Sequence, residues 1–302
     1  MERRRCGKSD IDISVLGIGC WSFGGGDYWG PQDQRDVEAV VQAALDCGIN
    51  YFDTAETYND GRGEESLGKA LKGRRHEAVI GTKVSPGNTK PSVLREHCEA
   101  SLRRLQTEYI DIYMIHWPIP DHKQAKDAFK TLIELQSEGK IRSIGVSNHG
   151  VQQLSEAMDT GARIDVDQLC YNLLSRAIEV DVLPFLRQHE IGVLAYMPLL
   201  QGILTGKYCT ADEVPPVRAR TRHFRGNRPG SRHGEAGAEE ELFEALDGIR
   251  EAALNEGIPM SQLALAWVMA KPGVTSVLAG TRNLLQLQEN IKPPLYPFLL
   301  RL

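Results

Sequence analysis

Residues 33–53 read DQRDVEAVVQAALDCGINYFD, and this stretch contains the unit from which we predict the whole fold. Its first part has the 3.6-residue apolar period of an amphipathic helix. The apolar positions are Val37, Val40, Val41, Ala44 and Leu45. Gly48 is typical of a helix C-terminus, and the apolar run 50–53 that follows it predicts a buried strand. The stretch therefore predicts one helix followed by one strand.

The same alternation continues along the chain. Short apolar runs predict eight strands, at residues 14–17, 50–53, 78–83, 109–116, 141–147, 166–171, 192–196 and 275–279. Longer periodic segments predict helices at residues 33–47, 64–71, 91–105, 124–138, 151–158, 181–189, 239–256 and 282–290. Because strand and helix alternate eight times, the pattern predicts an α/β fold, a single (β/α)8 TIM barrel.

The competing architecture is a doubly wound open sheet, which should carry Gly-x-Gly-x-x-Gly between its first strand and helix. Gly17, Gly19 and the glycine run 24–26 have the wrong spacing for that motif, so the barrel is favoured. Residues 1–13 predict an N-terminal β-hairpin that turns at residues 7–10 and could plug the barrel floor.

We predict one domain over residues 1–302, with two atypical segments. Residues 214–238 are rich in Pro and Gly, and their apolar residues follow neither the helical nor the strand period. They therefore predict a long mobile loop after the seventh strand. Residues 291–302 form a short tail in which three prolines exclude a helix.

The chain carries a formal charge of -5, which argues against nonspecific binding to nucleic acid. The loop is an exception, because residues 217–234 contain six arginines and no acidic residue. These are Arg218, Arg220, Arg222, Arg225, Arg228 and Arg232. We expect this segment to attract anions.

Six cysteines are scattered without Cys-x-x-Cys pairs or Cys/His ligand spacing, which argues against a metal site and a redox dithiol. Asp10 and Asp12 interrupt what would be the apolar part of a signal peptide, and the longest uncharged run, 191–206, is short for a membrane span. We therefore expect a cytoplasmic protein without a membrane or metal partner.

Four polar residues lie at or just after predicted strand ends, where parallel barrels place their catalytic groups. Asp53, Lys83 and His116 end three consecutive strands, and Tyr58 lies in the loop after the first of these. Taken singly, each has an ordinary alternative: a helix cap, a packing aromatic or a solvated tip. Together, on one face of the barrel, they indicate a catalytic group.

The charges of these residues suggest their chemistry. Asp53 can supply the carboxylate that a buried Lys83 needs, and a cation beside Tyr58 should lower the pKa of that phenol. Tyr58 would then be a usable proton donor, while His116 can donate a hydrogen bond to a carbonyl oxygen.

These residues lie within motifs that resemble the aldo-keto reductases over nearly the full length, from Gly17 to Asn290. The matching motifs include LGIGCW (16–21), FDTAETY (52–58), TK (82–83), DIYMIHW (111–117), IGVSN (144–148), QLCYN (168–172), YMPL (196–199) and GTR (280–282). The resemblance implies a TIM barrel and hydride transfer between a nicotinamide and a carbonyl carbon. It also implies that Asp53, Tyr58, Lys83 and His116 form the catalytic tetrad, with Tyr58 as general acid or base.

The resemblance also implies a cofactor site. Ser147, Asn148 and Gln168 would bind the nicotinamide carboxamide, and Tyr196 would stack on the ring; the structural alternative for Asn148 is a helix N-cap. The other implied cofactor positions are Trp21, Leu199, Gly202, Lys207, Gly280, Gln286, Glu289 and Asn290.

Arg282, at the predicted start of the last helix, implies a preference for NADP(H). In the family, this position grips the 2′-phosphate that NADP carries and NAD lacks, and a guanidinium suits a phosphate group. One alternative is that Arg282 is only a solvated residue at a helix start. Another is that the arginines of the loop, and not Arg282, bind the cofactor phosphates.

The chain contains four tryptophans. Trp21, Trp29 and Trp117 fall on loops of the catalytic face and are candidate substrate contacts, although a loop tryptophan often serves as a packing anchor. Trp267 lies in an apolar helical run and is predicted to be core.

The sequence thus predicts an NADP(H)-dependent oxidoreductase that acts on a small-molecule carbonyl or alcohol. One alternative is a cofactor-binding regulatory subunit, since some members of the resembling family are partners of channels. Another is a Schiff-base aldolase that uses Lys83, which would need an unpaired lysine with a lowered pKa.

Overall fold

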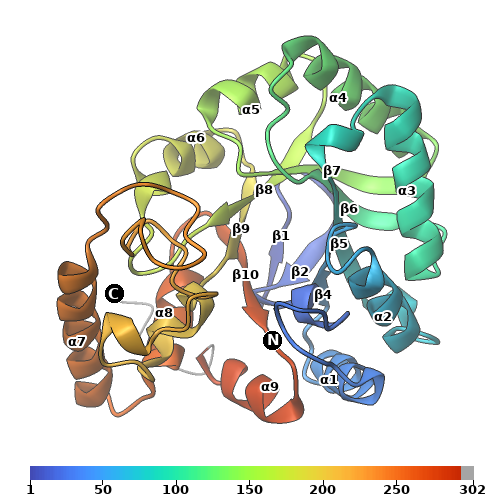
Figure 1. Cartoon of the computed structure of the whole chain (residues 1–302). Coiled ribbons are helices and arrows are strands. Elements are labelled where there is room, and N and C mark those ends of the chain that lie inside the picture. Colours follow the sequence, from blue (N-terminus) through green and yellow to red (C-terminus); the bar gives the residue numbers. More distant parts are fainter. Residues whose placement is uncertain (294–302) are drawn as a thin grey trace.

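A computed structural model describes residues 1–293, and it contains the predicted barrel (Figure 1). Eight parallel strands close on themselves in the order β10-β3-β4-β5-β6-β7-β8-β9. Their bounds are β3 (Leu16–Gly19), β4 (Tyr51–Asp53), β5 (Val79–Val84), β6 (Ile110–Ile115), β7 (Ile141–Ser147), β8 (Ile164–Cys170), β9 (Gly192–Tyr196) and β10 (Val274–Gly280). Every predicted strand is therefore confirmed, with ends that shift by at most two residues.

Helices surround the barrel on the outside, as Figure 1 shows. They are α1 (Gln34–Asp46), α2 (Arg62–Ala70), α3 (Pro91–Leu105), α4 (His122–Ser137), α5 (Val151–Met158), α6 (Val182–Gln188), α7 (Glu239–Asn255), α8 (Met260–Met269) and α9 (Leu284–Asn290). In α1 the predicted apolar face is buried, and the Asp33 carboxylate caps the helix by accepting from the backbone N–H of Arg35.

The ends of the predicted helices shift by at most two residues, and one helix of the structure was not predicted. α8 is an additional helix, and its apolar run is buried on all sides, including Trp267, which confirms that residue as core. α9 begins at Leu284 rather than at residue 282, because Asn283 caps it by accepting from the N–H of Gln286. Arg282 therefore precedes the helix.

The N-terminal hairpin is confirmed as β1 (Arg3–Arg5) paired antiparallel with β2 (Asp12–Ser14), and Figure 1 shows both strands behind the barrel opening. Cys6, Ile11 and Ile13 are buried in one cluster with the inward side chains of the barrel. Gly7 has φ +52°, and a Cβ there would lie 2.4 Å from the carbonyl oxygen of Asp165. The hairpin thus closes the amino-terminal end of the barrel and leaves the opposite end for chemistry.

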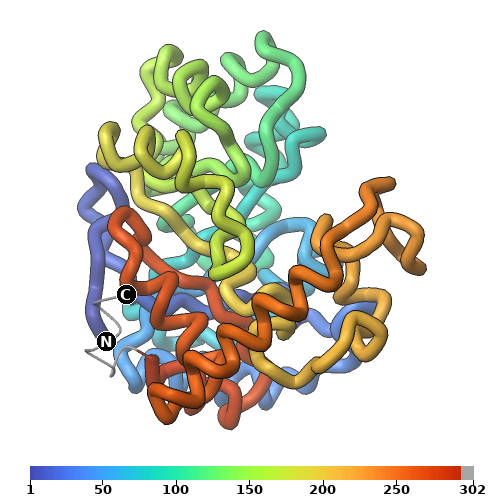
Figure 2. Tube along the Cα trace, turned by 90° about the vertical axis from the view of Figure 1, so that its left-hand side faces the viewer, coloured from blue at the N-terminus to red at the C-terminus, as the bar shows by residue number. Residues whose placement is uncertain are grey.

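The arginine-rich loop, residues 214–238, follows β9 and contains no helix or strand, as expected. It is packed nevertheless: Val214, Ala219 and Phe224 are buried in a second apolar cluster with residues of α7 and α8. Its orange segment projects at one side of the barrel in Figure 2. Its mobility stays a prediction, and the predicted tail lies outside the described residues from 294 onward.

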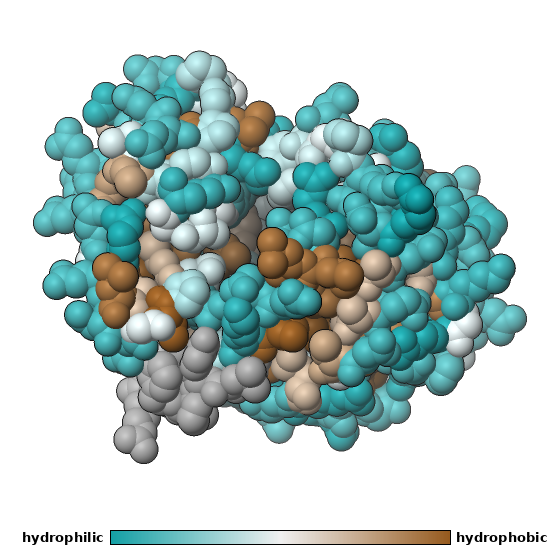
Figure 3. Space-filling view, turned by 90° about the horizontal axis from the view of Figure 1, so that it is seen from below, coloured by the Kyte–Doolittle hydropathy of each residue, from teal (hydrophilic) through white to brown (hydrophobic). Residues whose placement is uncertain are grey.

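The surface seen from below is mostly hydrophilic, with apolar areas among the polar side chains (Figure 3). Exposed large apolar residues of the described chain include Leu254 in α7 and Leu284 and Leu285 in α9. Within residues 1–293, no helix is both long and apolar enough to cross a membrane.

Candidate active site

The structure brings the four predicted catalytic residues together at the carboxyl ends of β4, β5 and β6. The Lys83 ammonium is fully buried; its Nζ lies 2.8 Å from Oδ2 of Asp53, 2.7 Å from the carbonyl oxygen of Thr54 and 3.4 Å from Oη of Tyr58. The Tyr58 and His116 rings meet edge to face, with centroids 5.8 Å apart. A carbonyl that reaches this point would face a phenol and an imidazole together.

Lys83 keeps its proton. Burial alone lowers the pKa of the ammonium, but Asp53 and Tyr58 outweigh burial and raise the pKa above its ordinary value. A Schiff-base nucleophile must be an unprotonated amine, so this environment argues against the aldolase alternative. Lys83 acts as a fixed positive charge.

The expectation for the pKa of Tyr58 is wrong in its net direction. Lys83 does lower the pKa of the phenol, as predicted, but burial is the larger effect and the pKa is raised above its ordinary value. At neutral pH the hydroxyl is therefore protonated. This form is the one that can give a proton to a carbonyl oxygen.

His116 is a neutral hydrogen-bonding group. Burial, followed by the nearby charge of Lys83, lowers the pKa of His116 to about 3. An uncharged imidazole retains one N–H, so it can donate a hydrogen bond to a substrate oxygen without competing as a proton source.

Glu56 is a further buried residue beside the predicted catalytic group, and its type and position alone did not predict a role for it. It lies two residues before Tyr58 and is buried; its Oε1 accepts from the N–H of Ser85 at 2.8 Å and from Nδ2 of Asn88 at 2.9 Å. Its Oε2 lies 2.7 Å from Nδ1 of His97 in α3. Glu56 thereby ties the loop that carries Tyr58 to the loop after β5. Its place inside the FDTAETY motif was the available signal.

The predicted nicotinamide-binding residues gather at the ends of β7, β8 and β9. Nδ2 of Asn148 donates to Oγ of Ser147 at 3.0 Å, and Oη of Tyr196 donates to Oδ1 of Asn148 at 2.8 Å. Nε2 of Gln168 donates to Oδ1 of Asp53 at 2.6 Å, which joins this group to the catalytic residues. The N-cap alternative for Asn148 is wrong, because Gly150 caps α5.

A turn after β9 holds three further predicted cofactor positions, Leu199, Gly202 and Lys207. The backbone here is strained, since Leu200 has φ +45° and Gln201 has φ +55°, and Gly202 follows with φ +93°. A positive φ in a residue other than glycine costs free energy, and such residues occur most often at ligand-binding and active sites. Lys207 is exposed, and its Nζ lies 4.8 Å from the ring centre of Tyr208.

Three aromatic residues form a surface beside Tyr58 that we call the aromatic wall: Trp21, Tyr28 and Trp29. Trp21 stacks on Tyr58 and on Tyr28 with centroid distances of 5.8 and 4.8 Å, and Trp29 meets Trp21 edge-on at 5.3 Å. Trp21 is thus adjacent to the catalytic phenol. Trp117 lies apart on the loop after β6 and is 52% exposed.

The arginine-rich loop lies over the aromatic wall. The guanidinium of Arg218 is centred 5.2 Å from the Tyr28 ring and 4.5 Å from the Trp29 ring, and that of Arg220 is 4.9 Å from the Tyr28 ring. Oη of Tyr28 also donates to the carbonyl oxygen of Val217 at 3.1 Å. Arg218 is therefore placed next to Trp29, a predicted substrate contact, and Arg220 next to Tyr28 of the same wall.

Arg282 is held by the loop that carries Trp29. Its Nη1 donates to the carbonyl oxygen of Trp29 at 2.8 Å, its Nη2 to that of Pro31 at 2.8 Å, and its Nε to Oε1 of Gln32 at 2.9 Å. Its own backbone N–H donates to Oε1 of Gln286 at 2.8 Å. Arg282 is thus a positioned cation rather than a freely solvated one.

The remaining positions near Arg282 make contacts within the protein. Glu289 accepts from Nε2 of Gln262 at 2.8 Å, and Nδ2 of Asn290 donates to Oγ1 of Thr281 at 3.1 Å. Gly280 ends β10 and is exposed, with open space where a Cβ would stand. Of these three, Asn290 is buried, whereas Gly280 is exposed and the Glu289 side chain keeps 43% of its surface exposed.

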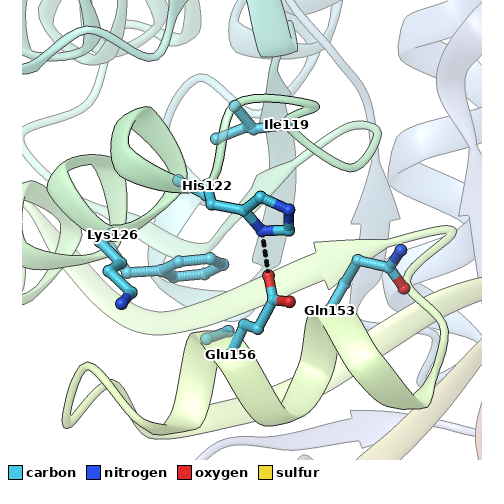
Figure 4. Close-up of a pocket in the computed structure, with 8 residues that line it drawn as sticks. Ile119, His122, Lys126, Gln153 and Glu156 are labelled. Carbon is cyan, nitrogen blue, oxygen red and sulfur yellow. Dashed lines mark hydrogen bonds and ion pairs between the residues drawn. The ribbon is translucent and has the colours of Figure 1, made fainter.

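A separate small hollow lies between α4 and α5 (Figure 4), and none of the four predicted catalytic residues lines it. It measures about 20 Å³, which is room for roughly one water molecule. His122 and Glu156 face each other across it, with Nδ1 and Oε2 2.9 Å apart. It is too small for a cofactor or a carbonyl substrate. Among the described residues, no group of three or more His, Cys, Asp and Glu side chains could hold a metal ion.

Residues 15–293 match the sequence model of the aldo/keto reductase family, and this range includes the barrel and all four predicted catalytic residues. The chain belongs to this family. It is 34% identical to the NADH-specific methylglyoxal reductase of Escherichia coli, over 96% of this chain and 93% of that protein. It is also 30% identical to a probable voltage-gated potassium channel subunit beta of Arabidopsis thaliana, over 97% and 90% of the two chains.

Solved structures of this family agree with the fold. An aldo/keto reductase of Klebsiella pneumoniae in complex with NADP and acetate is 29% identical, with a TM-score of 0.75 over 97% of this chain and 90% of that chain. The glycerol dehydrogenase of Gluconobacter oxydans is 32% identical, with a TM-score of 0.80 over 95% and 88%. The resemblance inferred from the motifs is therefore confirmed, and the chain is a member of an oxidoreductase family.

Proposed function

We propose that this protein transfers a hydride between NADP(H) and a small aldehyde or ketone, or the corresponding alcohol or sugar, with Tyr58 as general acid or base. The observation that carries the proposal is the contact of buried Lys83 with both Asp53 and Tyr58, beside His116. This arrangement fixes a protonated phenol next to a neutral hydrogen-bond donor, as carbonyl reduction requires.

The nicotinamide, when bound, supplies or takes up the hydride. The residues of the chain handle the oxygen and its proton. His116 donates a hydrogen bond that stabilises negative charge on the substrate oxygen, and Tyr58 gives its proton to that oxygen. The charge of Lys83 stabilises the phenolate that remains, and Asp53 keeps Lys83 protonated.

The proposed preference for NADP(H) rests on Arg282. Relatives do not decide it, because one is named NADH-specific while the Klebsiella pneumoniae structures contain NADP or NADPH. In this chain the Arg282 guanidinium is bound by neutral oxygens only, so its full charge remains for a phosphate. Ser147, Asn148, Gln168 and Tyr196 offer the donors, acceptors and aromatic face that a nicotinamide carboxamide and ring need.

Changing Arg282 to Ala should weaken NADPH binding while NADH binding stays nearly unchanged, since only NADPH carries the additional phosphate. A hydrogen bond between charged groups contributes about 1.5 to 3 kcal/mol, which is roughly ten- to a hundredfold in affinity. The loss should shrink at high salt, where charge interactions are screened. Fluorescence titration with each cofactor gives both dissociation constants.

A variant with the loop arginines Arg218 and Arg220 changed to Gln serves as the comparison. If the loop, and not Arg282, holds the 2′-phosphate, this loop variant should lose NADPH selectively. Equal losses of NADPH and NADH in the Arg282 variant would reject the assignment.

The substrate class can be tested directly. Oxidation of NADPH, followed by its absorbance, should occur with members of a panel of aldehydes, ketones, quinones and sugars. The second candidate function is a cofactor-binding regulatory subunit, which is favoured by two plant relatives that are each named a probable voltage-gated potassium channel subunit beta. Tight NADPH binding without turnover of any panel member would support that candidate. The cytoplasmic location and the lack of a nucleic-acid partner stay predictions.

A further inference from the structure

The loop that follows β3 and Arg282, the second residue after β10, are joined by a set of hydrogen bonds. Oε1 of Gln32 accepts from Nε of Arg282 at 2.9 Å, and Nε2 of Gln32 donates to the carbonyl oxygen of Arg282 at 3.1 Å. Gln32 thus holds both the side chain and the backbone of a residue 250 positions away. The carbonyl oxygens of Trp29 and Pro31 complete the set.

We propose that Gln32 is a positioning residue that orients Arg282 for the cofactor 2′-phosphate and, through the same bonds, fixes the aromatic wall beside Tyr58. The inference rests on the proposed NADP(H) function and names the device that gives the site its selectivity.

Charge is the first argument. A guanidinium has five N–H donors, and the loop uses three, each on a different nitrogen. All three acceptors are neutral, and in the part of the chain that the structure describes no carboxylate forms an ion pair with Arg282. The loop therefore orients the cation without neutralising it, and two N–H groups remain for an anion.

Arg228 in the arginine-rich loop shows the contrast. Its guanidinium donates to both carboxylate oxygens of Glu239 at 2.5 and 2.9 Å and to Asp212 at 2.9 Å. That charge is already paired within the protein. By comparison, Arg282 is a positioned cation whose charge is not paired with a carboxylate among the described residues and which keeps two N–H donors free. Recognition of a phosphate requires such a group.

Rigidity of the loop is the second argument. The N–H of Gly30 donates to the carbonyl oxygen of Gly26 at 2.7 Å. Gly25 packs so closely that a Cβ would lie 3.2 Å from the carbonyl oxygen of Gly30 and 3.3 Å from the nitrogen of Gln32. A loop folded on itself in this way can hold Arg282 in one orientation.

The same loop carries the aromatic wall. The Trp29 ring meets Trp21 edge-on at 5.3 Å, and Trp21 stacks on Tyr58 at 5.8 Å. A short chain of contacts therefore runs from Gln32 and Arg282 to the catalytic phenol. Loosening the bonds at Gln32 should disturb both the phosphate contact and the surface on which a carbonyl substrate rests.

The decisive variant is Gln32→Glu. Its carboxylate can still accept from Nε of Arg282, but it brings a negative charge to the place where the phosphate must bind. We expect NADPH to bind about ten- to a hundredfold more weakly and NADH to bind as before. Gln288→Glu, at an exposed position of α9, is the matched control because it adds the same charge without touching Arg282, and both affinities should stay unchanged there.

A second variant, Gln32→Leu, removes the bonds without adding charge. We expect a loss of NADPH affinity of about three- to tenfold, the worth of an ordinary hydrogen bond. We also expect a raised KM for the carbonyl substrate with kcat nearly unchanged, since the wall shifts but Tyr58 is intact. Thermal unfolding of each variant checks that the fold is kept.

The outcomes separate this inference from the proposed function. If the wild-type protein binds NADPH no more tightly than NADH, the proposed cofactor preference is wrong and the inference falls with it. If the wild type prefers NADPH but Gln32→Glu binds both cofactors normally, only the role of Gln32 is overturned. An unchanged KM in Gln32→Leu would overturn the link to the aromatic wall.

Discussion

Replacing Tyr58 by Phe is expected to lower turnover by about 10² to 10⁴, the usual contribution of general acid or base catalysis. The variant loses the hydroxyl that lies 3.4 Å from Nζ of Lys83, while its ring can keep the stacking on Trp21 and the edge contact with His116. NADPH binding should therefore be unchanged. Fluorescence titration with NADPH, beside steady-state turnover, measures the two effects separately.

Tyr113 provides a matched control. It is also a buried tyrosine, in β6, but its hydroxyl has no hydrogen-bond partner in the described structure. Tyr113→Phe should therefore leave turnover intact and cost little or no stability. Normal turnover in the Tyr58 variant would show that the proton comes from another group, and the assignment of the catalytic residues would be wrong.

The barrel could be predicted because its signal is repeated. A single run such as residues 50–53 is too short to separate a strand from a buried helical segment, but the alternation with amphipathic helices occurs eight times. The catalytic group follows from the same regularity. Since parallel strands place their carboxyl ends on one face, residues at or next to the ends of β4, β5 and β6 must meet there.

The strength of the electrostatic effects could not be predicted in the same way. The sequence places a cation beside Tyr58, and from this the pKa of the phenol was expected to fall. The net direction is upward, because burial outweighs the charge of Lys83. Burial depends on every element around the site, so the residue types alone do not fix the sign.

Contacts between loops could not be predicted from the sequence either. Gln32 and Arg282 lie 250 residues apart, and neither periodicity nor spacing indicates that they meet. The arginine-rich loop is similar: its composition predicts attraction for anions, but the structure pairs Arg228 with Glu239 and seats Arg218 on Trp29. Composition gives the charge of a segment, whereas packing decides which charges remain available.

Replacing Lys83 by Met is expected to abolish most of the activity and to lower the free energy of unfolding by about 3 to 5 kcal/mol at neutral pH, the usual cost of breaking a buried ion pair. Asp53, which is almost fully buried, would keep Gln168 as a donor but lose its cation. Urea unfolding measures the loss. Lys140→Met, which removes a surface pair with Glu99, should cost at most about 1 kcal/mol and keep full activity.

The stability deficit of the Lys83 variant should depend on pH in a defined direction. Burial raises the pKa of Asp53 in the folded protein above its ordinary value, and removing Lys83 takes away the charge that opposes this shift. The folded state then binds the Asp53 proton more tightly than the unfolded state. Stability from this group is present at low pH and lost as pH rises through the folded-state pKa, so the deficit should shrink as the pH falls toward 4 or so.

The activity of the same variant tests the second role of Lys83. Because the ammonium lowers the pKa of Tyr58, its removal should shift the pH profile of any residual alcohol oxidation upward. The double variant Asp53→Asn with Lys83→Met removes both buried charges, so most of the lost stability should return while activity does not. Recovery of activity in the double variant, or full activity of Lys83→Met with an unshifted profile, would show that the charge of Lys83 serves folding and not proton transfer.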